Sequence, residues 1–191
     1  MCMKNLLFIF LSFVFTCSSA QVRVEKKQAK AAFELLNDIR LHPERYKKKL
    51  GLFNLDKVTR KPLNWNKKLA AVAEDRAEDM AKRNYFDHVN PDGIGPNHYI
   101  QKSGYELNAS WLKNKKANNF ESIAWNWPTA SEGIKGLIIG KEAPGYHHRK
   151  HLLGMDQWNA SLYDIGIGYV TVGKKGNQKS YLCVIIAKHD W

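Results

Sequence analysis

The sequence predicts an α+β fold of one domain, in which a small antiparallel sheet lies between two layers of helices. Three observations lead to this prediction. Apolar residues recur three and four positions apart over much of the first half of the chain, which is the pattern of amphipathic helices. Two strand-like runs near the end, DIGIGYVTV and SYLCVIIA, have a turn between them and predict a hairpin. The run YLCVIIA is apolar at every position, so helices are expected to cover both faces of the sheet.

The first helix is predicted over residues 27–40, and His42 and Pro43 are expected to end it. Its apolar stripe is formed by Ala29, Ala32, Phe33, Leu36 and Ile39. Pro43 suits the first turn of a second, shorter helix through Leu50, because a proline there loses no hydrogen bond. Gly51 is placed to end that helix in the left-handed conformation.

The clearest helix follows Asn66, a good N-cap residue, and is expected to end near Asn84. Its apolar face consists of Leu69, Val72, Ala73, Ala77, Met80 and Ala81. A short helix is predicted from Pro96 to Ser103, and the polar stretch ELNASWLKNKKANN after it predicts irregular structure. The stretch therefore separates the long helix from the next strand.

The run FESIAWNW, beginning at Phe120, has the apolar character of a buried strand. Thr129 and Glu132 have the spacing of a capping box, which predicts a helix after this strand. That helix would carry Ile134, Leu137 and Ile138, although three glycines weaken the pattern. The final hairpin places Ile165, Ile167 and Tyr169 on one strand face, with glycines on the other.

Residues 1–20 have the pattern of a secretory signal peptide: Lys4, an apolar run over residues 6–15, and small residues before a cleavage point. Residues 21–191 are then expected to form one exported domain, secreted or periplasmic. A bacterial lipoprotein anchored through Cys17 is the less favoured alternative. No later stretch approaches the roughly 20 apolar residues that a membrane-spanning helix needs.

Only Cys183 remains after removal of the predicted signal, so no intrachain disulfide is expected, and the thiol is predicted to be a buried apolar group. The net charge is +12, which raises the question of nucleic acid. The lysines are scattered, however, and no nucleic-acid-binding motif accompanies them. We therefore expect no specific nucleic-acid binding, but loose attraction to anionic envelope or polysaccharide surfaces.

The run GYHHRKHLLG at residues 145–154 places His147 and His151 four positions apart, as on one face of a zinc-binding helix. The metalloprotease form of that motif needs a glutamate directly after the first histidine, and this chain has His148 there. Taken alone, the run favours a basic surface turn over a metal site.

The interpretation changes when this run is combined with YFDHVNPDG at 85–93, FESIA at 120–124 and the final hairpin with its GIGY sequence. These segments follow the long helix in this order. Together they resemble the CAP superfamily of cysteine-rich secretory, antigen and pathogenesis-related proteins, and specifically its cysteine-poor bacterial branch, the SCP-like domains. The resemblance covers about Ala31 to Ala187. It implies an α-β-α sandwich and a binding role more often than catalysis.

Residue by residue, the resemblance implies a cleft that two histidines and a glutamate line. His88 follows the aromatic pair after the long helix, Glu121 matches the family's cavity glutamate, and His148 matches its second histidine. The predicted cleft residues are His88, Glu121, Glu142, His148 and Arg149, of which Glu142 is poorly aligned.

The chain departs from the family pattern at three positions. Phe120 and His147 replace glycines, and Ser122 replaces an asparagine, so a bulkier pocket floor is expected. A shift of one position in the histidine register would make His147 the cleft residue in place of His148. His151 is expected to face solvent.

The two imidazoles of His88 and His148 suit a divalent metal, with Zn²⁺ as the candidate, and Glu121 would support them or bind directly. Alternatively these groups form only a buried hydrogen-bond network. Trp125 and Trp127 are expected to pack at the core and rim and not to form a ligand cage.

Three functions remain open. The first is an exported binding protein for a metal, a lipid, an envelope component or another small molecule. The second is a metal-assisted peptidase or esterase, in which zinc on His88 and His148 polarises a carbonyl and Glu121 activates water. The third is an adhesion or signalling surface. Binding is favoured over catalysis, because no serine lies in a nucleophile-elbow motif and the metal would have few anchors. The sequence does not predict an oligomeric state.

Overall fold

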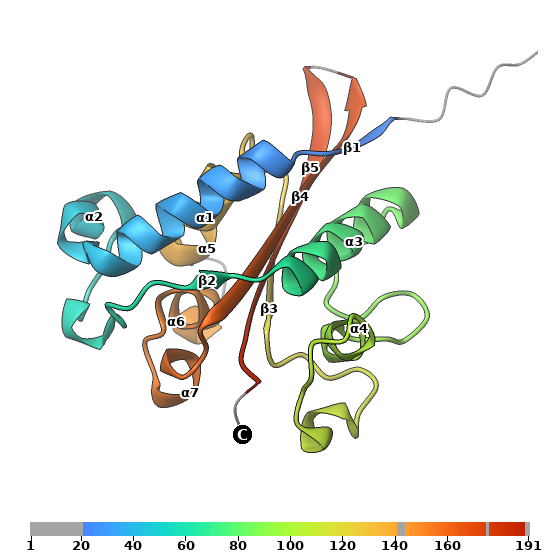
Figure 1. Ribbon diagram of the computed structural model, residues 1–191. Helices are drawn as coiled ribbons and strands as arrows, with labels where there is room; N and C mark the ends of the chain where they lie inside the picture. Colours follow the sequence, from blue (N-terminus) through green and yellow to red (C-terminus); the bar gives the residue numbers. More distant parts are fainter. Residues whose placement is uncertain (1–20, 141–143, 175, 190–191) are drawn as a thin grey trace, which may run out of the picture.

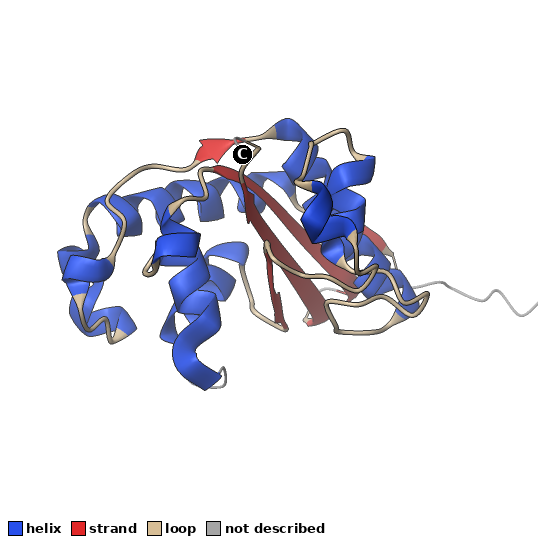
Figure 2. Cartoon of the chain, turned by 90° about the horizontal axis from the view of Figure 1, so that it is seen from below, coloured by secondary structure: helices blue, strands red, loops and turns tan. Residues whose placement is uncertain are grey.

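The computed structural model describes residues 21–140, 144–174 and 176–189 (Figure 1). The predicted signal peptide at 1–20, with Cys17, and the candidate cleft residue Glu142 lie outside the described residues. The predicted α-β-α sandwich is confirmed: helices cover both faces of a central sheet (Figures 1 and 2). Within the described ranges, no helix has both the length and the apolar character needed to cross a bilayer.

Over the described ranges the sheet has five strands, and four of them follow the order β1-β4-β5-β3. They are β1 (Val22–Val24), β4 (Asp164–Lys174), β5 (Asn177–Ala187) and β3 (Glu121–Trp125). Each neighbouring pair in this order is antiparallel, and the short β2 (Asn64–Trp65) lies parallel to β4. The predicted hairpin is therefore the centre of the sheet, and β3 forms one edge.

Two helical layers flank this sheet. One layer contains α1 (Lys26–Leu41), α2 (Pro43–Leu50), α5 (Ala130–Ile139), α6 (His147–Leu153) and the short α7 (Gln157–Ala160). The other contains α3 (Lys67–Arg83), which lies along β4 and β5, and α4 (Pro96–Lys102) beside it (Figure 1). Short 3₁₀ turns occupy Leu55–Lys57, Ala109–Leu112 and Pro144–Tyr146.

The predicted helix ends are formed by the expected capping residues. The Asn66 side chain accepts hydrogen bonds from the backbone N–H groups of Lys68 and Leu69 at the start of α3. Thr129 likewise accepts from the N–H of Glu132 at the start of α5, which confirms the N-terminal half of the capping box. Gly51 ends α2 with a φ of 56°, the left-handed conformation expected there.

The glycines of β4 determine how closely α3 approaches the sheet. A Cβ atom at Gly168 would lie 2.2 Å from the carbonyl oxygen of Ala73, and one at Gly166 would lie 2.1 Å from the backbone of Leu69. Any side chain at these positions would push the helix away. The opposite face of β4 carries the fully buried Ile165 and Ile167, as predicted.

Candidate functional site

The site is built around two consecutive residues of the edge strand β3. Successive side chains on a strand point to opposite faces. Glu121 contacts α3 and the loop after it, while Ser122 contacts α6 on the other side of the sheet. The structure thus brings His88 and His148 to the strand from opposite layers.

Glu121 is the buried anchor of the site. Its Oε1 lies 2.9 Å from Nδ1 of His88, its Oε2 lies 2.9 Å from Nε of Arg76, and the thiol of Cys183 approaches Oε2 at 3.2 Å. The side chain has no solvent exposure. Burial alone would raise the pKa of Glu121, but the hydrogen bond from His88 and the charge of Arg76 outweigh it and hold the pKa below its ordinary value. Glu121 is therefore an ionised carboxylate at neutral pH.

Arg76 fixes both Glu121 and the segment that carries His88. Its Nη1 donates to the Tyr85 hydroxyl at 3.0 Å, and its Nη2 donates to the backbone oxygens of Asp87 at 3.2 Å and His88 at 2.8 Å. Burial lowers the pKa of Arg76, but the Glu121 charge and hydrogen bonds together have the greater effect and raise it above the ordinary value. The guanidinium consequently remains charged and holds the histidine loop against α3.

Sequence reasoning missed Arg76, although a signal for it exists. It lies four positions after Val72 and four before Met80, in the apolar register of the predicted α3 helix. An arginine at a buried position needs an acidic partner, and Glu121 in the apolar run FESIA is an acid at a predicted buried position. Arg76 is only 2% exposed, which confirms that this register faces inward.

Ser122 links two histidines of α6. Its hydroxyl lies 3.0 Å from Nδ1 of His148 and 2.7 Å from Nδ1 of His151. The expectation that His151 faces solvent is wrong, because its ring is buried beneath Ser122 with 7% exposure. Burial lowers the pKa of His151 to about 4 and also lowers the pKa of His148, with the charges of His88 and His147 adding to the latter effect.

The two cleft histidines face each other. The ring centres of His88 and His148 are 6.4 Å apart, and the His88 side chain is 34% exposed. His147 is exposed at the start of α6, so His148 and not His147 stands opposite His88. The structure therefore brings together His88, Glu121 and His148, three of the five predicted cleft residues.

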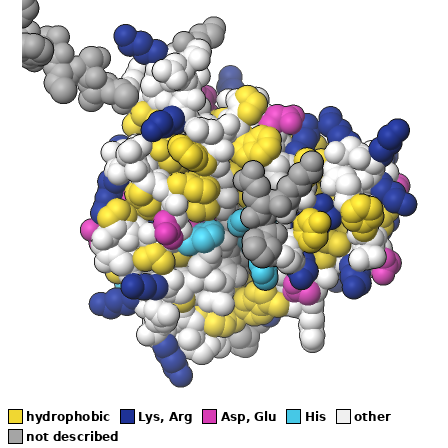
Figure 3. Space-filling view, turned by 180° about the vertical axis from the view of Figure 1, so that it is seen from behind, with side chains coloured by type: hydrophobic (Ala, Val, Ile, Leu, Met, Phe, Trp, Pro, Cys, Tyr) yellow, Lys and Arg dark blue, Asp and Glu magenta, His cyan; other side chains and the backbone are white. Residues whose placement is uncertain are grey.

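An apolar groove of about 450 Å³ begins at His148 and runs along β3. Its walls include Phe86, Ile123, Trp125, Trp127, Leu137 and Ile139. The rings of Phe86 and Trp125 stack with centres 6.0 Å apart, and both side chains are more than 40% exposed. Figure 3 shows histidine side chains beside hydrophobic ones on one face of the molecule. Trp125 and Trp127 thus line the groove, as rim residues with an open face.

Arg149 does not belong to this cleft, which corrects the expectation from the resemblance. Its guanidinium is buried and donates to the carbonyl oxygens of Ile138 and Ile139 at the end of α5, the latter at 2.9 Å. A weaker contact of 3.4 Å reaches the carbonyl oxygen of Leu50. Arg149 satisfies the terminal carbonyls of two helices, and its role is to hold α5 and α2 against α6.

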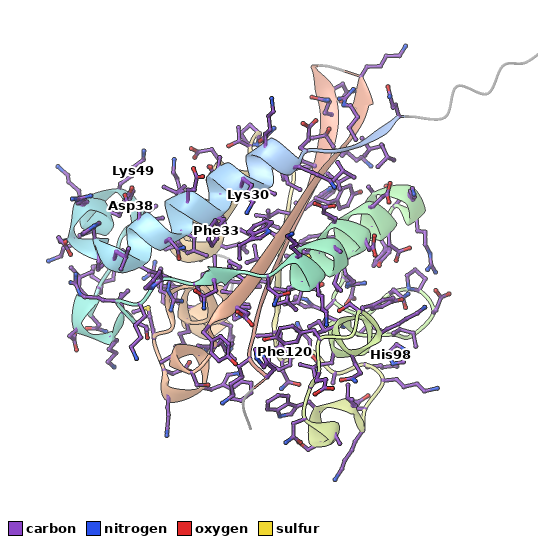
Figure 4. The ribbon with its side chains drawn as sticks, in the orientation of Figure 1. Lys30, Phe33, Asp38, Lys49, His98 and Phe120 are labelled. Atoms are coloured by element: carbon purple, nitrogen blue, oxygen red, sulfur yellow. The ribbon has the colours of Figure 1, made fainter. Side chains whose placement is uncertain are left out.

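Phe120 also lies elsewhere. Its ring packs against Trp111 at 5.2 Å and Trp158 at 5.9 Å between ring centres. Phe120 directly precedes β3 (Figure 4) and is not among the residues that line the groove. The expected bulkier floor due to Phe120 is therefore wrong. Since Glu142 lies outside the described residues, its place in the cleft stays a prediction.

In the part of the chain that the structure describes, a metal ion would have two firm nitrogen ligands here. Both Nδ1 atoms are hydrogen-bonded within the protein, which leaves Nε2 of His88 and Nε2 of His148. Among the described residues, no group of three or more His, Cys, Asp and Glu side chains is arranged to hold an ion. The donor set of the described chain thus fits a weakly held ion with several open positions.

The ring separation gives a second measure of the fit. A zinc–nitrogen bond of about 2.0–2.1 Å puts an ion about 3.2 Å from each ring centre, so two rings on one tetrahedral ion lie about 5.2 Å apart. The observed separation is 6.4 Å. The rings would have to approach by about 1 Å to share an ion, which requires a shift of one or both of these half-buried side chains.

Comparison with known proteins agrees with this architecture. The chain is 29% identical over 119 residues to the uncharacterized protein YkwD of Bacillus subtilis, a match that spans 62% of this chain and 39% of YkwD. Among solved structures it is similar to an extracellular protein containing an SCP domain from Bacillus anthracis, with a TM-score of 0.51, 22% identity, and coverage of 86% of this chain and 41% of that one. It is also similar to an outer surface protein of Borrelia burgdorferi, with a TM-score of 0.52 and 15% identity.

The last similarity covers 89% of this chain and 99% of the Borrelia protein, so the two share a fold over nearly their whole described lengths. The chain spans less than half the length of the two Bacillus proteins. The sequence profile of the cysteine-rich secretory protein family matches residues 33–186. Because this match covers most of the chain and the structure has the α-β-α sandwich, the chain belongs to the cysteine-rich secretory protein (CAP) family.

Proposed function

We propose that this chain is an exported binding protein that holds an amphiphilic ligand, a lipid or an envelope fragment, in the groove beside β3. The observation that carries the proposal is the apolar groove of about 450 Å³ that begins at His148, next to His88. Ligand sites are typically apolar clefts of about 300–1,000 Å³ with a few polar groups at one point. An apolar chain fits along the aromatic wall, and a polar head fits at the two histidines.

A divalent metal, with Zn²⁺ as the candidate, would add affinity for an anionic head. Glu121 accepts the Nδ1 proton of His88 and so leaves the Nε2 lone pair toward the cleft, the arrangement that carboxylates produce for metal-binding histidines. When bound, the ion would supply a positive charge and open coordination positions for the head group. His88 and His148 would hold it, and the ionised Glu121 would orient His88 without binding the ion.

The hydrolase alternative finds less support. It needs a carboxylate that can take a proton from a water molecule in the cleft. Glu121 has no solvent exposure, and Arg76, His88 and Cys183 surround its two oxygens. A carboxylate held in this way serves as an anchor, so binding is the better account of the site.

Export agrees with the pattern of residues 1–20 and with the descriptions of the two structural neighbours, which are an extracellular and an outer surface protein. One exposed surface also suits an anionic partner outside the cell. Lys47, Lys48 and Lys49 lie on the exposed face of α2, and the nearby Phe53 is 67% exposed (Figure 4 labels Lys49). Exposed lysines and an exposed aromatic ring favour a weak contact with an anionic lipid surface.

The proposal is tested by titrating the purified protein with a long-chain fatty acid, alone and with zinc, in a calorimeter. We expect binding that Trp125→Ala weakens about tenfold, since the groove loses its stacked ring. We expect zinc to raise the melting temperature, and His88→Ala or His148→Ala to remove that gain. His98→Ala, which changes an exposed histidine on α4, is the matched control. Absence of fatty-acid binding with and without zinc would refute the proposed ligand class.

A further inference from the structure

The hydroxyl of Ser122 lies between two imidazole nitrogens, at 3.0 Å from Nδ1 of His148 and 2.7 Å from Nδ1 of His151. A hydroxyl has one proton, so it donates to one of these nitrogens and accepts a hydrogen bond from the other. Each neutral imidazole in turn carries its proton on one nitrogen only. The tautomer of the buried ring and the tautomer of the cleft ring are therefore coupled through Ser122.

The surroundings of His151 decide the direction of the hydrogen bonds from His148 through Ser122 to His151. Its Nε2 is buried, and no group meets hydrogen-bond geometry there among the described residues. The backbone of Ile186 nevertheless acts on the ring in the sense that favours a proton, as a carbonyl oxygen near an N–H does. In the sheet, Ile186 donates its N–H to the carbonyl oxygen of Phe120. The Phe120 N–H donates to the side chain of Asn118 and not to the carbonyl oxygen of Ile186, so Phe120 does not occupy that oxygen.

The backbone of Ile186 therefore favours a proton on Nε2 of His151, while a bare Nε2 would have no donor among the described residues. With the proton on Nε2, Nδ1 of His151 accepts from the Ser122 hydroxyl. Ser122 must then accept from Nδ1–H of His148, and Nε2 of His148 carries no proton. The opposite direction would put a proton on Nε2 of His148 and leave the buried nitrogen of His151 without a donor.

We propose that Ser122 and His151 are positioning residues that fix His148 in the tautomer with a bare Nε2 toward the cleft. Glu121 does the same for His88 from the other face of the sheet. The two rings then each present a lone pair on Nε2, as a cation or a proton-donating head group requires. The inference rests on the proposed function of the cleft, and it assigns roles to a serine and a buried histidine outside the cleft itself.

The tautomer is measured directly in the metal-free protein by long-range ¹H–¹⁵N NMR of the histidine rings, with His148→Gln and His151→Gln used to assign the signals. We expect Nδ1–H and a bare Nε2 for His148, and the reverse for His151. In Ser122→Ala, His148 should show a mixture of tautomers. Ser122→Thr retains the hydroxyl and should keep the original pattern. A proton on Nε2 of His148 in the unsubstituted protein would overturn the inference.

Zinc affinity provides the second readout. Loss of an orienting partner behind a metal-binding histidine typically costs about 10–100-fold in affinity, so Ser122→Ala should weaken zinc binding by that factor. Ser180→Ala is the matched control, because Ser180 is a buried serine of β5 whose hydroxyl bonds the carbonyl oxygen of Trp127. Equal zinc affinities in the parent and Ser122→Ala would contradict the inference. Absence of zinc binding in the parent would refute only the metal, since the NMR pattern is read without it.

Discussion

Replacement of Arg76 by methionine should lower the free energy of unfolding by about 3–5 kcal/mol, the usual cost of removing one partner of a buried ion pair. The pair is an extreme case of burial: the side chains of Arg76 and Glu121 are 2% and 0% exposed. Methionine keeps the unbranched stem of arginine and lacks the terminal guanidinium group, so the change removes the charge and the donors while the apolar packing of the stem remains. The cost then arises mainly from a carboxylate left in the interior.

The contacts of Arg76 indicate where the loss would be felt. The guanidinium makes two hydrogen bonds to Glu121, at 2.9 and 3.3 Å, and three to the loop that carries His88. Without it, Glu121 retains the hydrogen bond from His88, and burial raises the pKa of the carboxyl toward protonation. A second substitution, Glu121→Gln, should therefore cost less in the Arg76→Met background than in the parent protein.

The assay is equilibrium unfolding in urea, followed by circular dichroism. Arg83→Met is the matched control, since Arg83 lies on the same helix but pairs with Asp92 at the surface, where the side chains are 34% and 64% exposed. That change should cost no more than about 1 kcal/mol. Equal unfolding free energies for Arg76→Met and Arg83→Met would show that the buried pair does not anchor the site.

Three further predictions follow from the structure. The unfolding free energy should fall as the pH drops from about 6.5 to about 4, by up to about 1.4 kcal/mol per pH unit. The reason is that burial holds the pKa of His151 at about 4 in the folded protein, while the unfolded chain takes up the proton at higher pH. Urea titrations at several pH values measure this slope, and His151→Gln should flatten it. Gly136→Ala should displace Trp127, whose ring lies 2.2 Å from the added Cβ position, and should weaken fatty-acid binding about tenfold. Unchanged binding in the calorimeter would contradict the proposal that the fatty acid occupies the groove. Glutamine at Lys47–Lys49 or serine at Phe53 should reduce sedimentation with anionic vesicles, and zwitterionic vesicles are the control.

Most of the fold can be predicted from the sequence because its signals are local. The helix starting after Asn66 is expected to end near Asn84, and it ends one residue earlier; the cap and the apolar stripe both come from neighbouring residues. The sequence does not predict the strands β1 and β2, since three and two residues are too few to show an alternating pattern. They exist because β4 offers them hydrogen-bonding partners, which is a tertiary effect.

The site is harder to predict from the sequence. The resemblance identifies His88, Glu121 and His148, whose side chains the structure brings together. It does not reveal that the arginine after His148 faces away from the cleft, because a helix of seven residues turns each successive side chain by about 100°. The burial of His151 follows from the same geometry: three positions after His148, it lies on the same side of α6, but deeper against β3.

The edge position of β3 explains why two histidines from opposite layers can meet at all. In a central strand, Glu121 and Ser122 would direct their partners to opposite faces, and the sheet itself would separate the rings. At an edge, each ring extends past the last strand, and the ring centres come within 6.4 Å. The meeting of the two rings then depends on the register of β3 against β5. A slip of one residue would turn Ser122 toward Arg76 and Glu121 toward α6, because each side chain would move to the other face of the sheet. The buried ion pair penalises that slip by leaving two charges unpaired, so the same contact that stabilises the fold also keeps the two imidazoles facing each other.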